Sequence, residues 1–390
     1  MPVVRVALLL VGSASALVPW RRIPPFVPVL VVAVIGVVSG IVPWHDARGA
    51  GHDLGPALAF LVLAVPLAVL LDRSGFFAAI AARVDGGHRL TTWLWLLAAA
   101  TTIVFNLDAA VVLLTPLYVR IAVRHRLDVV HVALIPALLA SLASSVLPVS
   151  NLTNLIAAGR VDLSAGSFLT HLALPSVVAI LVGGILHLRS GAPATGPSAD
   201  DETVDPRALR IGTPVVVFLL AGFTLGDRLG LPAWSIAGVA LVVLMIHQRH
   251  LPWRDIPVGA VAVASGLGVL AAAAAAHLPT EHLLSIRGAP GTIATVATMA
   301  VGANAINNLP ALLLTLPGLD LHPGRVWAAL LGVNIGPTIW VTGALSTLLW
   351  QSTLSRLGHR VSAREYARAG IRAGVPALVA ATGVLLLTTR

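Results

Sequence analysis

The sequence predicts an all-α polytopic membrane protein built from two inverted repeats, and three observations lead to this prediction. Of the 390 residues, 57% are hydrophobic and only 11% are charged, with a mean hydropathy of +0.92. Soluble domains carry about a quarter of charged residues. Apolar runs long enough for membrane helices recur from one end of the chain to the other. Two of these runs are broken by polar clusters, as in the re-entrant hairpins of transporters.

The charge and the special residues exclude several classes of protein. The net charge is +9, but all 25 basic residues are arginines in short gaps between apolar runs, where the positive-inside rule places them. There is no cysteine, the histidines show no metal-ligand spacing, and no phosphate-binding glycine loop ends in lysine. We therefore expect a lipid bilayer as the surroundings, with no nucleic-acid partner, no cofactor, no metal site and no enzymatic activity.

About ten membrane helices are expected from apolar length and from the glycine, proline and charge breaks between them. They are placed at residues 3–18, 24–42, 54–72, 131–157, 167–187, 209–226, 231–246, 257–276, 326–350 and 373–388. The first has an alternative interpretation, because Arg5 followed by an apolar stretch and Ser13–Ala16 resembles a secretory signal. Its removal would leave the first half one helix short of the second, so symmetry favours a retained helix.

Two halves of the same plan follow from this assignment. Residues 1–188 form the first repeat, with a hairpin at about 91–123 and a broken helix at about 131–157. Residues 189–208 form a cytoplasmic linker, and residues 209–390 form the second repeat, with a hairpin at about 289–317 and a broken helix at about 326–350.

The orientation of these halves follows from the arginines. If both hairpins return to their own side, most arginines fall on one side, which is then cytoplasmic, and both termini face outward. The second half enters from the opposite side, so the repeats are inverted. Sequence similarity between the two halves supports this pairing of repeats: residues 106–116 align without gaps to 307–317, and 152–156 align to 345–349.

The polar breaks predict one central solute site, because irregular backbone at membrane depth is tolerated only when buried in protein or lining a wet cavity. For each break the alternative is structural: the amides cap helices, and the hydroxyls bond back to the previous turn. The candidate solute-binding residues are Asn106, Ser150, Asn151, Thr153, Asn154, Asn304, Asn307, Asn308, Asn334, Thr338, Thr342 and Ser346.

Asp108 is the one acid inside an otherwise apolar stretch. A carboxyl at membrane depth can carry a proton, so we expect Asp108 to couple transport to protons. The alternative is that it only caps the second helix of the hairpin, where an acid near the N-terminus is favourable. The two roles are compatible.

Several blocks of sequence together resemble a known family. They are 71–77 (LDRSGFF), 106–116, 147–155 (LPVSNLTNL), 307–310 (NNLP), 332–337 (GVNIGP) and 348–350 (LLW). In this order they resemble the arsenical pump membrane proteins, the arsenite efflux permeases. These belong to the ion transporter superfamily that also contains citrate and dicarboxylate carriers.

The resemblance implies export of arsenite or antimonite across the plasma membrane, driven by the proton gradient or through a cytoplasmic ATPase subunit. Dicarboxylate carriers of the superfamily have Ser-Asn-Thr at both hairpin tips, whereas this chain has 106–108 (NLD) and 307–309 (NNL). The alternative is a citrate, dicarboxylate or other small-anion carrier of the same superfamily. An intramembrane enzyme or assembly protein is a further alternative, but Asp108 has no acid–base partner in the other breaks.

Overall fold

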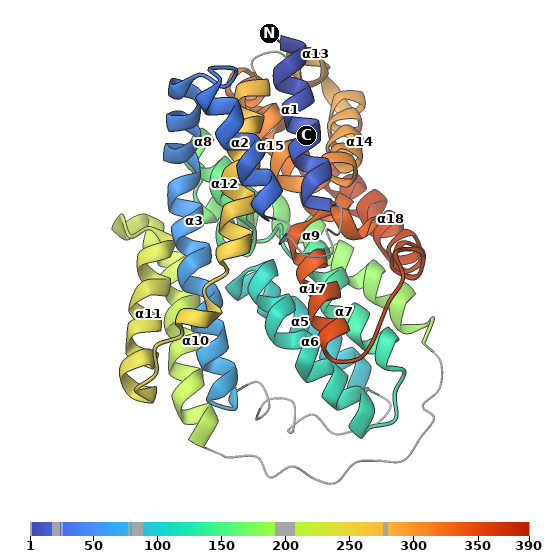
Figure 1. The fold of residues 1–390 in the computed structure, drawn as a ribbon. Coiled ribbons are helices and arrows are strands. Elements are labelled where there is room, and N and C mark those ends of the chain that lie inside the picture. The colour runs from blue at the N-terminus through green and yellow to red at the C-terminus, as the bar shows by residue number, and fades with distance from the viewer. Residues whose placement is uncertain are drawn as a thin grey trace.

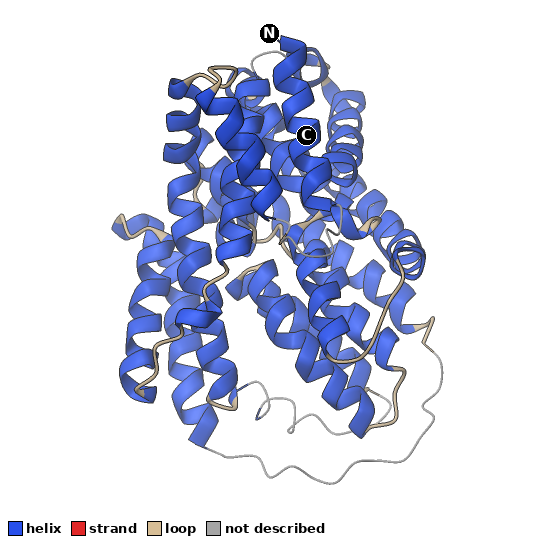
Figure 2. Cartoon of the chain, viewed as in Figure 1, coloured by secondary structure: helices blue, strands red, loops and turns tan. Residues whose placement is uncertain are grey.

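The computed structural model describes residues 2–17, 24, 26–76, 79, 89–191, 207–275 and 280–389. Every regular element in these residues is an α-helix or a short 3-10 turn (Figure 2). The predicted all-α class is therefore confirmed. The predicted cytoplasmic linker, 189–208, falls mostly outside the described residues.

The first half contains two interrupted helical segments. Its elements are α1 (Pro2–Leu17), α2 (Phe26–Val38), α3 (Trp44–Arg73), α5 (Leu90–Phe105), α6 (Leu107–Arg124), α7 (Val129–Leu142), η1 (Pro148–Ser150), α8 (Leu152–Val161) and α9 (Ala165–Leu188). The segment predicted as a hairpin is the pair α5 and α6, which pack against each other. The segment predicted as a broken helix is α7, η1 and α8. Its interruption follows from Pro148, because proline disfavours helical backbone at the residue before it and Leu147 is extended.

The second half runs through a similar order of elements. They are α10 (Arg207–Leu225), η2 (Gly226–Leu229), α11 (Ala233–Gln248), η3 (Trp253–Asp255), α12 (Val258–Ala275), α13 (Thr280–Ser285), α14 (Gly288–Ile306), α15 (Asn308–Leu321), η4 (Pro323–Arg325), α16 (Val326–Ile335), η5 (Gly336–Thr338), η6 (Val341–Gly343), α17 (Leu345–Arg356) and α18 (Ala363–Thr388). Helices α14 and α15 form the hairpin segment, and α16 to α17 form the interrupted helix. The inverted relation of the two halves stays a prediction.

Two helices begin ten residues earlier than the apolar runs predicted: α3 begins at Trp44 and α18 at Ala363. The physical reason is that hydropathy marks only the apolar part of a helix. Helix α18 starts in a polar segment with a capping box, in which Ser362 accepts from the Glu365 amide and the Glu365 carboxylate accepts from the Ser362 amide. The added turns are polar and extend beyond the apolar stretch.

Five described helices are long and apolar enough to cross a membrane, namely α3, α9, α12, α14 and α18. Apolar helices of 10–17 residues are found in α1, α2, α5, α7, α10, α11 and α15. Three of them, α5, α7 and α15, belong to the interrupted segments, where a helix is expected to span the apolar layer only in part. The count of about ten spanning helices therefore stays a prediction.

The two halves interlock instead of forming separate bodies. Helix α12 of the second half packs against α1, α2 and α3 of the first half, and α18 packs along α9. Helix α17 packs on α6, and α15 packs on α8. In Figure 1, α1, α2, α12 and α15 lie together in the upper part of the view, with α10 and α11 beside the lower part of α3. The main apolar core draws residues from both halves, so the central site is built between them.

Candidate functional site

The two hairpin tips share one local structure. Asn106 separates α5 from α6 with φ 124° and ψ 149°, and Asn307 separates α14 from α15 with φ 79° and ψ 153°. Positive φ is unusual for residues other than glycine, and asparagine tolerates it better than most. Each side-chain oxygen then caps the next helix: Asn106 Oδ1 accepts from the Asp108 amide at 2.6 Å, and Asn307 Oδ1 from the Leu309 amide at 3.3 Å. The asparagines thus turn the chain and start the second arm.

The interruption in the first half is closed by its own asparagines. Asn151 caps α8 by accepting from the Thr153 amide at 3.2 Å. Asn154 Nδ2 donates to the carbonyls of Ser144 and Leu147 at 2.7 and 2.9 Å. Both carbonyls lie in the non-helical stretch after α7, where an unpaired carbonyl in an apolar layer would cost several kcal/mol. The amides therefore stabilise the broken backbone.

Asn334 of α16 binds the same interruption from the second half. Its Oδ1 accepts from Asn151 Nδ2 at 2.9 Å and from Thr153 Oγ1 at 2.7 Å. Its Nδ2 donates to Asn154 Oδ1 at 2.6 Å and to Ser145 Oγ at 3.2 Å. All five side chains are buried. The predicted convergence of polar breaks is thus found between α16 and the first interruption, in one hydrogen-bond network that joins the halves.

The second interruption is satisfied by residues of the second hairpin. Asn304 Nδ2 donates to the Gly336 carbonyl at 2.8 Å, and its Oδ1 accepts from the Trp340 amide at 3.0 Å. Asn307 Nδ2 donates to the Thr342 carbonyl at 3.3 Å. Asn304 therefore does for the second break what Asn154 does for the first. Both of its polar atoms are occupied by backbone groups.

A small cavity of about 30 Å³ lies between these elements, with room for about two water molecules. The polar residues that line it are Asp108, Asn151, Thr153, Asn307 and Asn308. They come from the first turns of α6, α8 and α15 and from their caps, so the N-termini of these three helices meet at the cavity, beside Leu345 at the start of α17. Helix N-termini carry partial positive charge, which favours oxygen-rich or anionic groups.

Asp108 is the only charged side chain among the residues that line the cavity. The residue is 4% exposed, and its Oδ1 has no hydrogen-bond partner. A buried carboxyl oxygen without a partner is costly unless it is protonated or meets a ligand. The Asp108 carboxyl is therefore free to exchange a proton or to contact a solute.

Eight of the twelve predicted solute residues do not line the cavity. Asn154 and Asn334 belong to the adjoining network. Asn106 caps α6, Asn304 binds the second interruption, and the Ser150 hydroxyl donates to the Ile103 carbonyl at 2.7 Å. Two threonines also lie outside the lining. The Thr342 carbonyl accepts a hydrogen bond from Asn307 Nδ2, and the Thr338 hydroxyl donates to the Ile335 carbonyl at 2.9 Å.

The close packing around Thr338 shows what this residue contacts. Gly370 and Gly374 of α18 lie so near that an added Cβ would meet Thr338 atoms at 1.7 and 2.1 Å. Helix α18 thus approaches the second interruption through glycines. Ser346, the remaining predicted residue outside the cavity, is fully buried at the start of α17, and its hydroxyl has no hydrogen-bond partner.

Sequence reasoning missed the apolar wall of the cavity. Leu61 of α3 and Val263, Ala264 and Leu267 of α12 line one side of it. These residues sit inside uniformly apolar runs, and nothing in such a run distinguishes a residue that faces the site from one that faces lipid. Ser145 was also missed as a member of the Asn334 network.

Comparison with known proteins places the chain in a family. A family model described as citrate transporter matches residues 15–345. The chain belongs to the citrate transporter family. The arsenical pump membrane protein of Yersinia enterocolitica is 28% identical and covers 92% of each chain. That of Escherichia coli strain K12 is 27% identical and covers 91% of each chain. The YdaH transporter of Alcanivorax borkumensis shares the fold, with a TM-score of 0.61, 13% identity and coverage of 90% of this chain and 89% of its own.

The resemblance to the arsenical pump membrane proteins, inferred from the motifs, is thereby confirmed. Members of the citrate transporter family are ion transporters, so this chain is a multi-pass membrane transporter of the plasma membrane and not an enzyme. In a transporter of this kind, interrupted helices that meet at membrane depth form the solute site. The cavity beside Asp108 is the candidate for it.

Proposed function

We propose that this chain exports arsenite or antimonite across the plasma membrane and couples the export to the proton gradient. The observation that carries the proposal is the cavity between the two hairpin tips and the first interruption. Amides and a hydroxyl line it beside one carboxyl, and no cationic side chain is among the lining residues. The names of the curated relatives, arsenical pump membrane proteins, support the choice of solute.

Arsenite fits this lining by its chemistry. Near neutral pH it is an uncharged trihydroxide, whose hydroxyls both donate and accept hydrogen bonds. Asparagine amides offer donors and acceptors, and the Thr153 hydroxyl offers both. A neutral solute needs no arginine or lysine, which is consistent with the lining. Candidate contacts are Asn151, Thr153, Asn307 and Asn308, and we retain Ser346 because its buried hydroxyl is unpartnered.

Asp108 provides the proposed link to protons. Export of an uncharged solute gains nothing from the membrane potential unless an ion moves in exchange. The Asp108 carboxyl is the one titratable group in the cavity lining, so it can bind a proton when the site opens outward and release it when the site opens inward. A moving hairpin unit of one half would carry the site between the two sides. A cytoplasmic ATPase subunit is the alternative source of energy.

The second candidate function is transport of a small anion such as citrate. The family description and the three helix N-termini at the cavity favour it. Against it stands the absence of any cationic side chain among the lining residues, since polycarboxylates in proteins are usually bound by arginine or lysine. In its ionised form the Asp108 carboxylate would also repel an anion in the cavity.

Uptake of arsenite into inverted membrane vesicles tests the proposal. We expect accumulation that requires an imposed proton gradient and proceeds without ATP. Citrate offered in a parallel set separates the two functions. Citrate flux without arsenite flux would show that the protein transports small anions and not arsenite. Arsenite flux that needs ATP would indicate the ATPase partner.

Asp108→Asn tests the proton link in the same vesicles. We expect the protein to fold normally, because Asp108 Oδ1 makes no hydrogen bond that the amide would lose. Gradient-dependent arsenite accumulation should be lost, as expected for removal of the group that carries the proton. Asp162→Asn, at an exposed position just after α8, serves as the carboxylate control for folding. Unchanged gradient dependence in Asp108→Asn would rule out the proposed role.

A further inference from the structure

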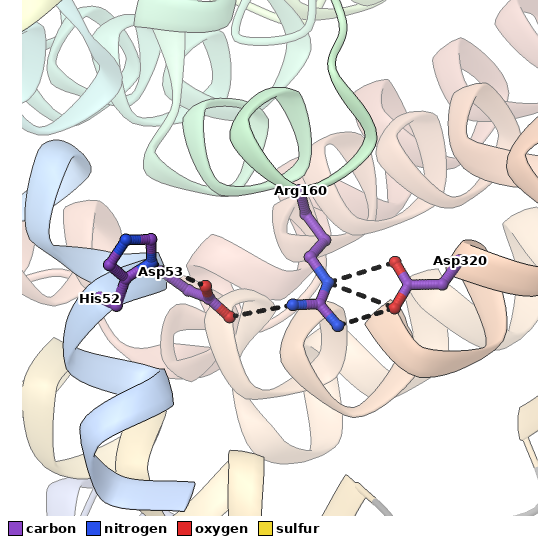
Figure 3. Close-up of polar contacts among 4 residues, drawn as sticks. All are labelled: His52, Asp53, Arg160 and Asp320. Atoms are coloured by element: carbon purple, nitrogen blue, oxygen red, sulfur yellow. Dashed lines mark hydrogen bonds and ion pairs between the residues drawn. The ribbon is translucent and has the colours of Figure 1, made fainter. Parts of the chain in front are cut away.

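A cluster of three charged residues joins the far ends of the helices that form the cavity. Arg160, in the last turn of α8, lies between Asp53 of α3 and Asp320 of α15 (Figure 3). Its Nη2 and Nε contact Asp320 Oδ2 at 2.8 and 3.2 Å, and Nε also contacts Oδ1 at 3.2 Å. Its Nη1 lies 3.6 Å from Asp53 Oδ2. The guanidinium fork thus holds one carboxylate from each half of the chain.

The position of this cluster relates it to the cavity. Helices α8 and α15 both begin at the cavity, with Thr153 and Asn308 in their first turns. At 1.5 Å per residue, Arg160 lies roughly 10 Å beyond Thr153 along α8, and Asp320 lies roughly 18 Å beyond Asn308 along α15. The two helices pack against each other, and α3 packs on α8. The cluster therefore lies over one end of the cavity and joins the elements that would part if the cavity opened there.

This end of the molecule is the one that the arginine distribution predicts to be extracellular. The three side chains are about one-third to two-fifths exposed, so solvent screens their attraction and the pair is easy to break. Hydrogen bonding to Asp320 and the nearby Asp53 carboxylate raise the pKa of Arg160. A raised pKa keeps the guanidinium charged until the pH rises far above the physiological range. Arg160 therefore does not release the contact by losing its proton.

We propose that Arg160, with Asp320 and Asp53, is the outer gate of the transporter, and that its ion pairs break when the central cavity opens to the outside. The inference rests on the proposed transport function but not on the identity of the solute. Breaking a weak exposed contact requires little energy, so the same contact can close again in every cycle. In the structure both ion pairs are formed beside a small cavity, as expected for a closed outer gate.

The absence of native cysteine allows a direct test. Ala264 lines the cavity from α12 and is buried, and cysteine is a similarly small, apolar replacement. The Ala264→Cys protein, produced in intact cells, is treated from outside with a sulfonated maleimide that cannot cross the membrane, without added solute. Asp320→Asn in this background should raise the labelling rate up to about fivefold, because it removes the closer carboxylate of a weak contact.

Three further variants make the result specific. Asp53→Asn should raise labelling less than Asp320→Asn, because the Asp53 contact is longer. Arg48→Gln removes a positive charge from an exposed position near the same end of α3 and should leave the rate unchanged. The exchanged pair Arg160→Asp with Asp320→Arg should return the rate toward that of the parent, since the contact is rebuilt with opposite polarity.

The outcomes separate this inference from the proposed function. Equal labelling of Asp320→Asn and its parent, with both proteins folded by size-exclusion chromatography, would overturn the gate. So would a raised rate that the exchanged pair fails to lower, because the effect would not then come from the ion pair. Raised labelling that the exchange reverses supports the gate even if vesicles show no arsenite flux, in which case the proposed solute alone is wrong.

Discussion

The two interrupted helices follow the same path but are held in different ways. In each, a 3-10 turn leads into an extended cap residue and a new helix: η1 and Asn151 before α8, and η6 and Ala344 before α17. The cap residues have nearly the same backbone angles, φ −149° and ψ 142° against φ −142° and ψ 153°. The Asn151 side chain caps its helix, whereas the methyl group of Ala344 cannot accept a hydrogen bond.

The difference extends to the hydroxyl groups that follow each cap. Thr153 after the first cap donates to Asn334, but Ser346 after the second cap is buried and its hydroxyl has no hydrogen-bond partner. A buried unpartnered hydroxyl costs about 1 to 3 kcal/mol. The polar side chains of the first interruption are therefore paired with Asn334, whereas the second interruption keeps the Ser346 hydroxyl, which a solute or a conformational change can supply with a partner. The predictions below test this contrast.

The largest effect is expected for Asn334→Ala, which removes the centre of the network at the first interruption. Four buried side chains lose a partner, so we expect unfolding to become easier by about 3 kcal/mol. Thermal unfolding in detergent measures this loss. Ser145→Ala, which removes only one of the four contacts, is the control and should cost about 1 kcal/mol. Equal losses in the two variants would show that Asn334 is not the centre of the network.

A smaller effect is expected at the hairpin tips, where the halves are alike. Asn106→Ala and Asn307→Ala each place alanine at positive φ and remove a helix cap. The backbone strain amounts to about 1 to 3 kcal/mol. Glycine at the same positions accepts positive φ and should cost much less. Unfolding of the four variants in detergent compares the tips, and a tip at which alanine and glycine cost the same would contradict the strain argument.

The sequence predicts these local features well, because each depends on residues that are neighbours in the chain. Polar residues inside apolar runs mark the breaks at Asn106, Asn151 and Asn307, and the structure places helix caps at all three. The all-helical class follows from composition in the same way. Apolar length alone misplaced the starts of α3 and α18, since a capped polar turn extends a helix beyond its apolar part.

Contacts between distant segments could not be predicted. Asn334 was expected to contact solute, yet its amide binds the break of the other half, some 180 residues away. Asn304 was expected to contact solute, yet backbone groups occupy both of its polar atoms. The partners of Arg160 come from two other helices. Such pairings depend on how the helices pack, which hydropathy and spacing do not specify.

A cap added to the second interruption would make it resemble the first. In Ala344→Ser, the new hydroxyl can accept from the first-turn amides of α17, which should stabilise the protein by about 0.5 to 2 kcal/mol. If this interruption moves during transport, the added cap should also slow arsenite uptake into inverted vesicles. Ala329→Ser, a fully buried position inside α16, is the control and should not stabilise. A stabilised protein with an unchanged rate would indicate that this interruption does not move.

The smallest change in stability is expected for Ser346→Ala, and it distinguishes a solute contact from a structural hydroxyl. Because the Ser346 hydroxyl has no partner, its removal should leave stability unchanged or raise it by about 1 kcal/mol. Thr153→Val is the matched variant in the first interruption and should destabilise, since the Thr153 hydroxyl donates to Asn334. If Ser346 contacts the solute, half-maximal arsenite uptake by Ser346→Ala vesicles requires a higher concentration while the protein remains as stable as the parent. Unchanged uptake together with raised stability would show that the Ser346 hydroxyl neither contacts the solute nor stabilises the fold. The polar side of the solute site would then be the first interruption, with Asn151 and Thr153.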